Sequence, residues 1–212
     1  MATRRRGNQA QQSGFGFGKD AGVLQVMPQA LRNDSADLLG NVALLKSLKI
    51  GLICSIKCPG DVILKTLNLM HHLDGTGFCF VGGFHSPVEQ ECLTILLRSN
   101  QKLIICPARN IRKMRLSRAI KNAIAEERLA LLSPFPERYR QASARTAQIR
   151  NLMVAALADR VLVFHAAPGG KTEELVKEVA GWGKAVYTIE SEYNAHLAKL
   201  GLRMINSIKD LD

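Results

Sequence analysis

The sequence predicts an α/β protein whose mostly parallel sheet carries helices on both faces, and two observations support this prediction. Between residues 48 and 190, short apolar runs of strand length alternate with longer segments whose apolar residues have helical spacing. Glycine, proline and serine stand at the boundaries, where turns and helix caps prefer them. Such alternation is typical of parallel strands joined by crossover helices, which cover both faces of the sheet.

The individual elements follow from their local patterns. Six apolar runs are expected to form strands, at 50–54, 78–81, 103–106, 129–132, 161–164 and, as the last core strand, 185–189. Helices are expected at 59–73, 86–97, 114–127, 144–158 and 173–182. Ser86 and Pro87 illustrate the boundary signals, since serine is a good N-cap and proline fits the first turn of a helix.

Length and composition indicate one domain. The 212 residues are 47% hydrophobic, enough for a full core, yet no apolar run is long enough to cross a membrane. Residues 1–20 are basic and rich in Gln, Ser and Gly, which predicts a disordered tail; residues 21–212 are expected to form a single domain with a lead-in segment at 21–47. The basic start is not followed by an apolar stretch, so we expect no secretory signal and a cytoplasmic protein, with five reduced cysteines.

The charge balance indicates the class of partner. The chain has 29 basic and 18 acidic residues, a net charge of +11, so polyanions are attracted. Only 5% of residues are aromatic, which favours phosphate contacts over extended base stacking. We expect a basic patch for nucleic acid that consists of Arg109, Arg112, Arg115, Arg118 and Arg145. Of these, Arg112, Arg115 and Arg118 recur every three residues, which predicts that they share one helical face.

Three turns follow strands directly and open helices, as phosphate-binding turns do. Their candidate ligand-binding residues are Ser55 and Lys57 after the first strand, Gly82, Gly83, His85 and Ser86 after the second, and Gly169, Gly170, Lys171 and Thr172 after the fifth. The last turn is not a Walker phosphate loop, because Ala166 stands where that motif requires glycine. The dinucleotide-binding glycine fingerprint is absent as well.

The segment 148–187 resembles the DNA-processing protein A family (DprA, or Smf) in the order and spacing of its motifs. Gln148-Ile149-Arg150-Asn151 resembles the family's Arg-Asn-Arg helix start, and the turns at Ser55–Lys57 and Gly82–His85 resemble its Gly-Ser-Arg and Ser-Gly-Gly-Ala-Arg turns. The resemblance covers about residues 48–190 and implies an extended Rossmann-like fold that binds single-stranded DNA in a basic pocket and assists recombinase loading during DNA uptake. It adds Arg150 and Asn151 to the candidate site. His85 stands where the family has arginine, and Leu152 replaces its second helix arginine.

Two alternative functions remain at this point. Pro168–Glu174 resembles the Pro-Gly-Gly loop of lysine-decarboxylase-like (LOG) phosphoribohydrolases. This resemblance implies hydrolysis of a nucleoside monophosphate by Arg150 with Glu173 or Glu174. Leu175 stands where that family has its catalytic glutamate. The third hypothesis is a nucleotide-sensing module. The leading hypothesis is a binding protein without catalytic residues, cofactor or metal, whose partners are single-stranded DNA, a recombinase and a second copy of the chain, and not a membrane.

Overall fold

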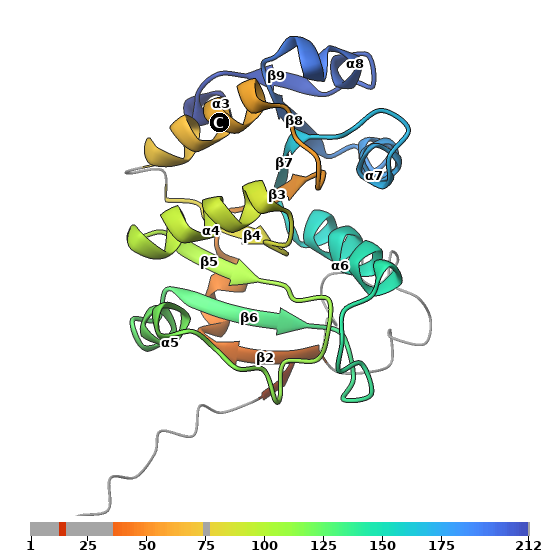
Figure 1. Ribbon diagram of the computed structural model, residues 1–212. Helices are drawn as coiled ribbons and strands as arrows, with labels where there is room; N and C mark the ends of the chain where they lie inside the picture. Colours follow the sequence, from red (N-terminus) through yellow and green to blue (C-terminus); the bar gives the residue numbers. More distant parts are fainter. Residues whose placement is uncertain (1–12, 16–35, 74–76, 212) are drawn as a thin grey trace, which may run out of the picture.

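Figure 1 shows a computed structural model of the protein, in which residues 13–15, 36–73 and 77–211 are described. Within these ranges nine strands form one sheet: β1 (Ser13–Phe15), β2 (Ala36–Gly40), β3 (Lys49–Cys54), β4 (Cys79–Gly82), β5 (Lys102–Ile105), β6 (Leu129–Ser133), β7 (Arg160–His165), β8 (Ala185–Ile189) and β9 (Arg203–Ile205). Their order is β1-β2-β6-β5-β4-β3-β7-β8-β9. The seven strands from β6 to β9 run parallel, and β2 and β1 extend the sheet antiparallel at one edge.

Helices connect the parallel strands. They are α3 (Gly60–His71), α4 (Pro87–Arg98), α5 (Arg118–Ala125), α6 (Ala144–Leu157), α7 (Lys171–Ala180) and α8 (Ala195–Ala198), with short 3-10 helices η1 (Val42–Lys46), η2 (Glu192–Asn194) and η3 (Ile208–Leu211). In Figure 1, α3, α4 and α5 lie on one side of the sheet, and α6 and α7 lie on the other. The fold therefore has the three layers that the sequence predicts, with both sheet faces covered.

Each sheet face has its own apolar core, because alternate strand residues point to opposite faces. On the side of α6 and α7, Ile53 and Val81 pack with Met153 and Val176. On the side of α3, α4 and α5, their strand neighbours Leu52 and Phe80 pack with residues of those helices. The two cores hold the sheet rigid between them, so the loops at its edge start from fixed positions.

The strand order reverses between β3 and β7. From β3 the chain proceeds through β4 and β5 to β6, then returns to place β7 on the other side of β3. In open parallel sheets, ligands bind in the crevice outside the carboxyl ends of the strands at such a switch point. The fold therefore places the turns after β3, β4 and β7 next to one another at this edge.

Three parts of the described structure differ from the sequence predictions. The helix expected at 114–127 begins only at Arg118, capped by Ser117, so Arg112 and Arg115 lie before it and do not share a helical face with Arg118. The sheet does not end at 185–189, since β9 pairs with β8 beyond it. Residues 13–15 pair with β2 instead of being disordered, while the rest of the expected tail lies outside the described residues.

Candidate functional site

Three loops meet at the switch point: loop 1 (residues 55–59, after β3), loop 2 (residues 83–86, after β4) and loop 3 (residues 166–170, after β7). Ser55 joins loops 1 and 3, because its backbone N–H donates to the carbonyl of His165 at 2.9 Å and its Oγ accepts from the backbone N–H of Ala167 at 3.0 Å. The prediction that the three candidate turns share one sheet edge is therefore confirmed.

Glu89 joins loops 1 and 2 from the first turn of α4. One carboxylate oxygen accepts from the backbone N–H of Cys54 at 2.7 Å, and the other accepts from those of His85 at 2.7 Å and Ser86 at 3.3 Å. Burial raises the pKa of Glu89, although these hydrogen bonds and the charge of Arg150 oppose that shift. The buried carboxyl group of Glu89 thus fixes loop 2 and the end of β3, from which loop 1 starts.

Arg150 projects from α6 into the same region and is only 3% exposed. Its Nη1 donates to the carbonyl of Cys106 at 3.3 Å, and its buried Nε has no hydrogen-bond partner among the described residues. Burial lowers the pKa of Arg150, while Glu89 raises it. A buried guanidinium donor without a partner is costly, and it is the feature expected where an anionic ligand completes the hydrogen bonding.

Gly83 lies against this guanidinium. A Cβ atom at Gly83 would come within 1.4 Å of Nη1 and 1.9 Å of Cζ of Arg150, so a side chain at this position and the observed arginine exclude each other. The backbone of loop 2 can pack this closely only because residue 83 is glycine. Loop 2 thereby covers Arg150 and holds it in place.

A cavity of about 220 Å³ opens between loop 1, loop 2, α6 and the N-terminus of α7. It brings together six of the residues predicted from sequence: His85, Ser86, Arg150, Asn151, Lys171 and Thr172. Lys171 begins α7, whose N-cap is Gly170 and has no side-chain cap, so the helix N-terminus adds exposed N–H donors and a partial positive charge. The lining therefore combines cations, hydroxyls and a helix N-terminus, as anion-binding sites do.

The remaining predicted loop residues stand around this cavity without lining it. They are Ser55, Lys57, Gly82, Gly83, Gly169 and Gly170. Lys57 is exposed on loop 1, and Gly169 has a φ of +70° that favours glycine. These positions shape the loops, whereas Arg150, Asn151, Lys171 and Thr172 supply the polar groups.

Sequence reasoning missed several lining residues, among them Glu89, Gln148 and Ile56. Glu89 carried a usable signal, because Ser86 followed three residues later by glutamate is the capping-box pattern, and the structure forms that box. Gln148 lies one helical turn before Asn151, so its position follows once α6 is placed. Ile56 gave no signal beyond its place between Ser55 and Lys57.

The predicted arginine patch is divided in the structure. Arg112 forms a two-pronged ion pair with the buried carboxylate of Asp37, with Nη2 to Oδ1 at 3.0 Å, so its charge is already paired. Arg115, Arg118 and Arg145 are exposed. Arg109 is half-buried and lines a separate cavity of about 160 Å³. The patch is thus a set of separate cations rather than one helical face.

The acidic residues of the hydrolase alternative do not line the cavity that contains Arg150. Glu173 is buried and accepts from the backbone N–H of Gly169 at 3.1 Å and from Lys177 Nζ at 2.9 Å, and these bonds lower its pKa. Glu174 is exposed on α7 and lines a neighbouring cavity with Lys171 and Asn151. Glu173 therefore ties the first turn of α7 to loop 3, a structural role.

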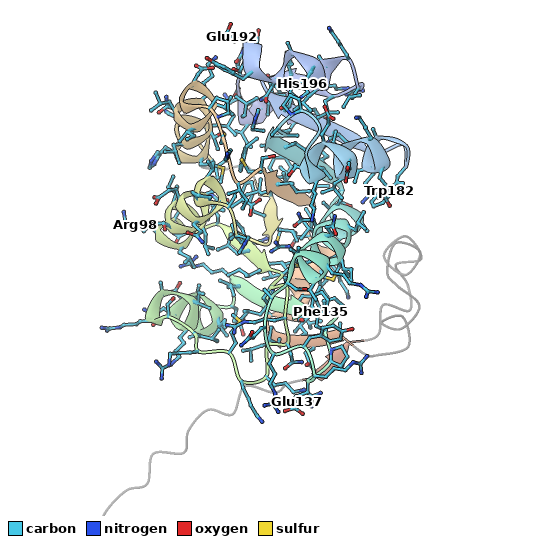
Figure 2. The ribbon with its side chains drawn as sticks, turned by 45° about the vertical axis from the view of Figure 1, so that its right-hand side comes forward. Arg98, Phe135, Glu137, Trp182, Glu192 and His196 are labelled. Atoms are coloured by element: carbon cyan, nitrogen blue, oxygen red, sulfur yellow. The ribbon has the colours of Figure 1, made fainter. Side chains whose placement is uncertain are left out.

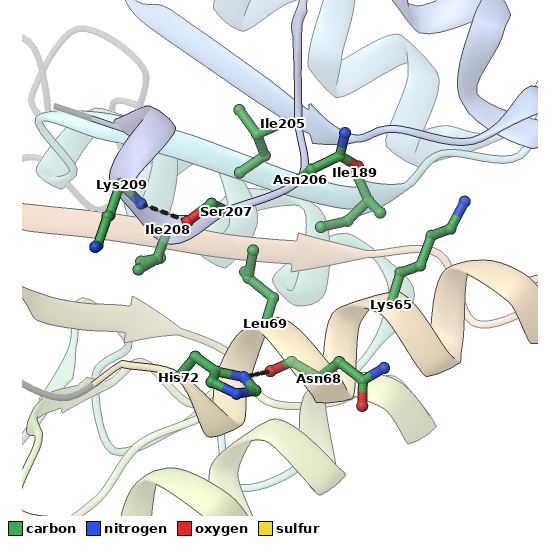
Figure 3. Close-up of a pocket in the computed structure, with 10 residues that line it drawn as sticks. All are labelled: Lys65, Asn68, Leu69, His72, Ile189, Ile205, Asn206, Ser207, Ile208 and Lys209. Atoms are coloured by element: carbon green, nitrogen blue, oxygen red, sulfur yellow. Dashed lines mark hydrogen bonds between the residues drawn. The ribbon is translucent and has the colours of Figure 1, made fainter.

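A larger cavity, of about 500 Å³, lies between α3 and the C-terminal η3 (Figure 3). Its floor is apolar, with Leu69 and Ile205, and its rim carries Lys65 and Lys209. Neither the buried guanidinium nor any candidate residue predicted from sequence lines it, so size alone does not identify the site.

Two further properties concern the described part of the chain. Its helices all fall short of the length and apolar character that crossing a bilayer requires. Across the same residues, no three His, Cys, Asp or Glu side chains gather in a way that would hold a metal ion.

Comparisons with known proteins concern the family and the fold. No curated protein sequence matches the chain at a significant level. Among solved structures, the chain is similar to DNA processing protein A from Streptococcus pneumoniae (TM-score 0.74, 17% identity, covering 96% of this chain and 74% of that one). It is also similar to DNA processing protein A from Helicobacter pylori, which binds single-stranded DNA (TM-score 0.68, 19% identity, covering 87% and 90%).

A more distant similarity in fold extends to a molybdenum cofactor binding protein from the phototrophic bacterium Rippkaea orientalis (TM-score 0.51, 13% identity, covering 77% of this chain and 91% of that one). The family resemblance seen in the sequence motifs is confirmed by a match over nearly the whole described structure. The model of the DNA recombination-mediator protein A family matches residues 37–208, and the chain therefore belongs to that family.

Proposed function

We propose that this protein binds single-stranded DNA through the cavity at the switch point, in DNA uptake and recombination, and that it does so without chemistry of its own. The observation that carries the proposal is the buried Arg150, which lines a cavity shared with the N-terminus of α7 and whose Nε lacks a partner within the part of the chain that the structure describes. Family membership supports it, as does the single-stranded DNA bound by the Helicobacter pylori protein.

The lining favours phosphate as the recognised group. Arg150 is a bidentate donor, Lys171 is a point charge, and Thr172 and Asn151 add neutral donors, all of which are common phosphate contacts. No Phe, Tyr or Trp stands among the described residues that line the cavity, so the extended stacking of bases that such side chains provide is not expected. We therefore expect affinity with little sequence preference.

Fluorescence anisotropy titrations with a labelled oligonucleotide test the proposal. Single strands are expected to bind more tightly than the matching duplex, because a flexible single strand can bend its phosphates into the cavity and a duplex is too stiff to do so. Affinity should fall steeply with salt, and each lost phosphate contact should reduce the slope of log affinity against log salt by about 0.7. Arg150→Gln and Lys171→Gln are each expected to lower both affinity and slope.

Arg98→Gln is the matched control, because it removes the same charge from the exposed end of α4, at the opposite edge of the sheet (Figure 2). Lys171 is exposed, so its variant is expected to fold normally even if Arg150→Gln is destabilised. Equal loss of affinity in Arg98→Gln and Lys171→Gln would mean that net charge, and not this cavity, attracts DNA.

Two other assays separate the alternative functions. Thermal stabilisation by a mononucleotide without any effect of oligonucleotides would favour the sensing module. Release of free base from a nucleoside monophosphate would favour the hydrolase; neither Glu173 nor Glu174 lines the cavity that contains Arg150, which gives no support for that reaction.

The proposal extends to partners and location. A recombinase that receives the DNA and a second copy of the chain remain expected partners. Cytoplasmic location is part of the same proposal, and the five free cysteines suit a reducing compartment.

A further inference from the structure

A second basic cavity, of about 160 Å³, lies between loop 4 (residues 106–117, after β5) and loop 5 (residues 134–143, after β6). Its lining brings together Arg109 and Lys113 from loop 4 with Arg140 and Glu137 from loop 5. Lys113 and Glu137 form an ion pair, with Nζ and Oε1 3.3 Å apart. The guanidinium groups of Arg109 and Arg140 have no hydrogen-bond or ion-pair partner within the described ranges, so two unpaired positive charges face this cavity.

Hydrogen bonds hold loops 4 and 5 together beside these arginines. The backbone N–H of Asn110 donates to the carbonyl of Tyr139 at 2.8 Å, and its Nδ2 donates to the carbonyl of Phe135 at 2.7 Å. Ser133, at the end of β6, donates its Oγ to the carbonyl of Arg109 at 2.7 Å. Like charges at one cavity repel each other, so a framework that keeps them there is expected where an anion binds.

Two short chain segments connect this cavity to the one that contains Arg150. Cys106, whose carbonyl accepts from Nη1 of Arg150 at 3.3 Å, stands three residues before Arg109. Ala144, which lines the DNA-binding cavity at the start of α6, stands four residues after Arg140. An extended chain spans at most about 3.6 Å per residue, so each segment covers no more than about 14 Å. Figure 1 shows loops 4 and 5 leaving the sheet at the edge where α6 begins.

We propose that Arg109 and Arg140 form a second phosphate site, which binds the same DNA strand a few nucleotides away from Arg150. The inference rests on the proposed DNA-binding function. Guanidinium groups match the geometry of a phosphate and stay charged at every physiological pH. A single strand is flexible enough to follow the sheet edge from one cavity to the other. The second site therefore sets the length of strand that the protein covers.

Salt-dependent titrations with a labelled oligothymidylate test the second site. Arg109→Gln and Arg140→Gln should each lower affinity several-fold and reduce the slope of log affinity against log salt by about 0.7, as one lost contact to a single strand does. Arg140 is exposed, so its variant is expected to fold normally even if the half-buried Arg109 tolerates replacement less well. An unchanged slope in both variants, or an equal change in the control Arg98→Gln, would overturn the proposal.

Glu137→Gln tests the charge of this cavity with the opposite sign. The change removes the acidic group of the lining and frees Lys113 from its ion pair. Both side chains are exposed, so the stability of the fold should change little. Affinity for the oligothymidylate should rise several-fold, because a phosphate in the cavity meets one more cation and one carboxylate fewer. Unchanged or lower affinity would contradict a phosphate at this position.

Strands with only two charged phosphates separate this proposal from the proposed function. In an oligothymidylate whose other linkages are neutral methylphosphonates, wild-type affinity should be highest at one spacing of the two phosphates, and Arg140→Gln should abolish that dependence. Wild-type affinity that is independent of spacing would show that the cavities do not share a strand. Loss of affinity in Arg140→Gln with none in Lys171→Gln would instead reject the proposed function and leave a single phosphate site, at Arg109 and Arg140.

Discussion

Replacing Gly83 with alanine tests the contact that positions Arg150. A Cβ atom would lie 1.4 Å from Nη1, 1.9 Å from Cζ and 2.5 Å from Nε of Arg150, far inside contact distance. The clash involves the far end of a flexible side chain, so the guanidinium can move away, and the adjoining cavity of about 220 Å³ is the space available to it. In doing so it gives up its bond to the carbonyl of Cys106.

The magnitude follows from what is lost. A hydrogen bond from a charged donor contributes about 1.5–3 kcal/mol, and overpacking a well-packed position costs about 1–3 kcal/mol. If the guanidinium moves, the hydrogen bond is lost but the clash is relieved, so the two costs do not add. We therefore expect Gly83→Ala to lower the free energy of unfolding by about 2 kcal/mol. The displaced guanidinium also occupies the cavity, so oligonucleotide affinity should fall at least as far as in Arg150→Gln.

Urea unfolding and DNA titration measure the two effects. Gly60→Ala is the control, because a Cβ at Gly60 meets nothing within 4 Å. A double-mutant cycle with Arg150→Ala isolates the contact, since Gly83→Ala should cost little once the guanidinium is gone, with a coupling of about 1–3 kcal/mol. Wild-type affinity in Gly83→Ala, or a coupling below about 0.5 kcal/mol, would refute the reasoning.

Three further predictions concern neighbouring residues. Glu89→Gln should lower the free energy of unfolding by about 2–4 kcal/mol, because an amide NH₂ would face backbone N–H donors of loop 1 or loop 2. Burial raises the pKa of Glu89 in the folded protein. The free energy of unfolding of the wild type, relative to that of this variant, should therefore fall as pH rises from about 4.3, the usual glutamate pKa, through the raised pKa. A relative stability that rises over this pH range would contradict burial as the dominant effect. Ile56→Ala should weaken oligonucleotide binding without changing the salt dependence, because Ile56 is apolar and 61% exposed where it lines the cavity. Leu64→Ala is the control that should have no effect, since Leu64 is 66% exposed on α3. Equal losses of affinity in the two variants would exclude a local contact of Ile56 with DNA. Arg112→Gln should change DNA affinity less than Arg115→Gln in the same titration, because the charge of Arg112 is already paired with a buried carboxylate.

The sequence predicts most of the fold because its signals are local. The boundaries of α4 follow from Ser86 and Pro87, and those of β3, β4 and β7 follow from apolar runs. The late start of α5 depends instead on distant contacts: Asn110 binds Asp37, 73 residues away, and holds the preceding segment out of the helix. β9 has three residues, too few for a period to be recognised.

The candidate site divides in the same way. Glycines and cations after the strands mark the loops, so His85, Lys171 and Thr172 are predictable. The burial of Arg150 beneath Gly83 is not predictable from the sequence, because it arises from packing between α6 and loop 2, and the two residues are 67 positions apart in the chain. An arginine that looks like part of a solvated basic segment therefore lies inside the protein, where its charge has the greatest effect on a ligand.

The bond between Ser55 and the backbone of Ala167 spans 112 residues. Contacts of such sequence separation form late in folding, because the closure of a long loop must precede them. During synthesis from the N-terminus, β3 and loops 1 and 2 emerge well before loop 3 and α7 exist. A nascent chain therefore cannot present the completed cavity, and the DNA affinity that we propose requires the return to β7.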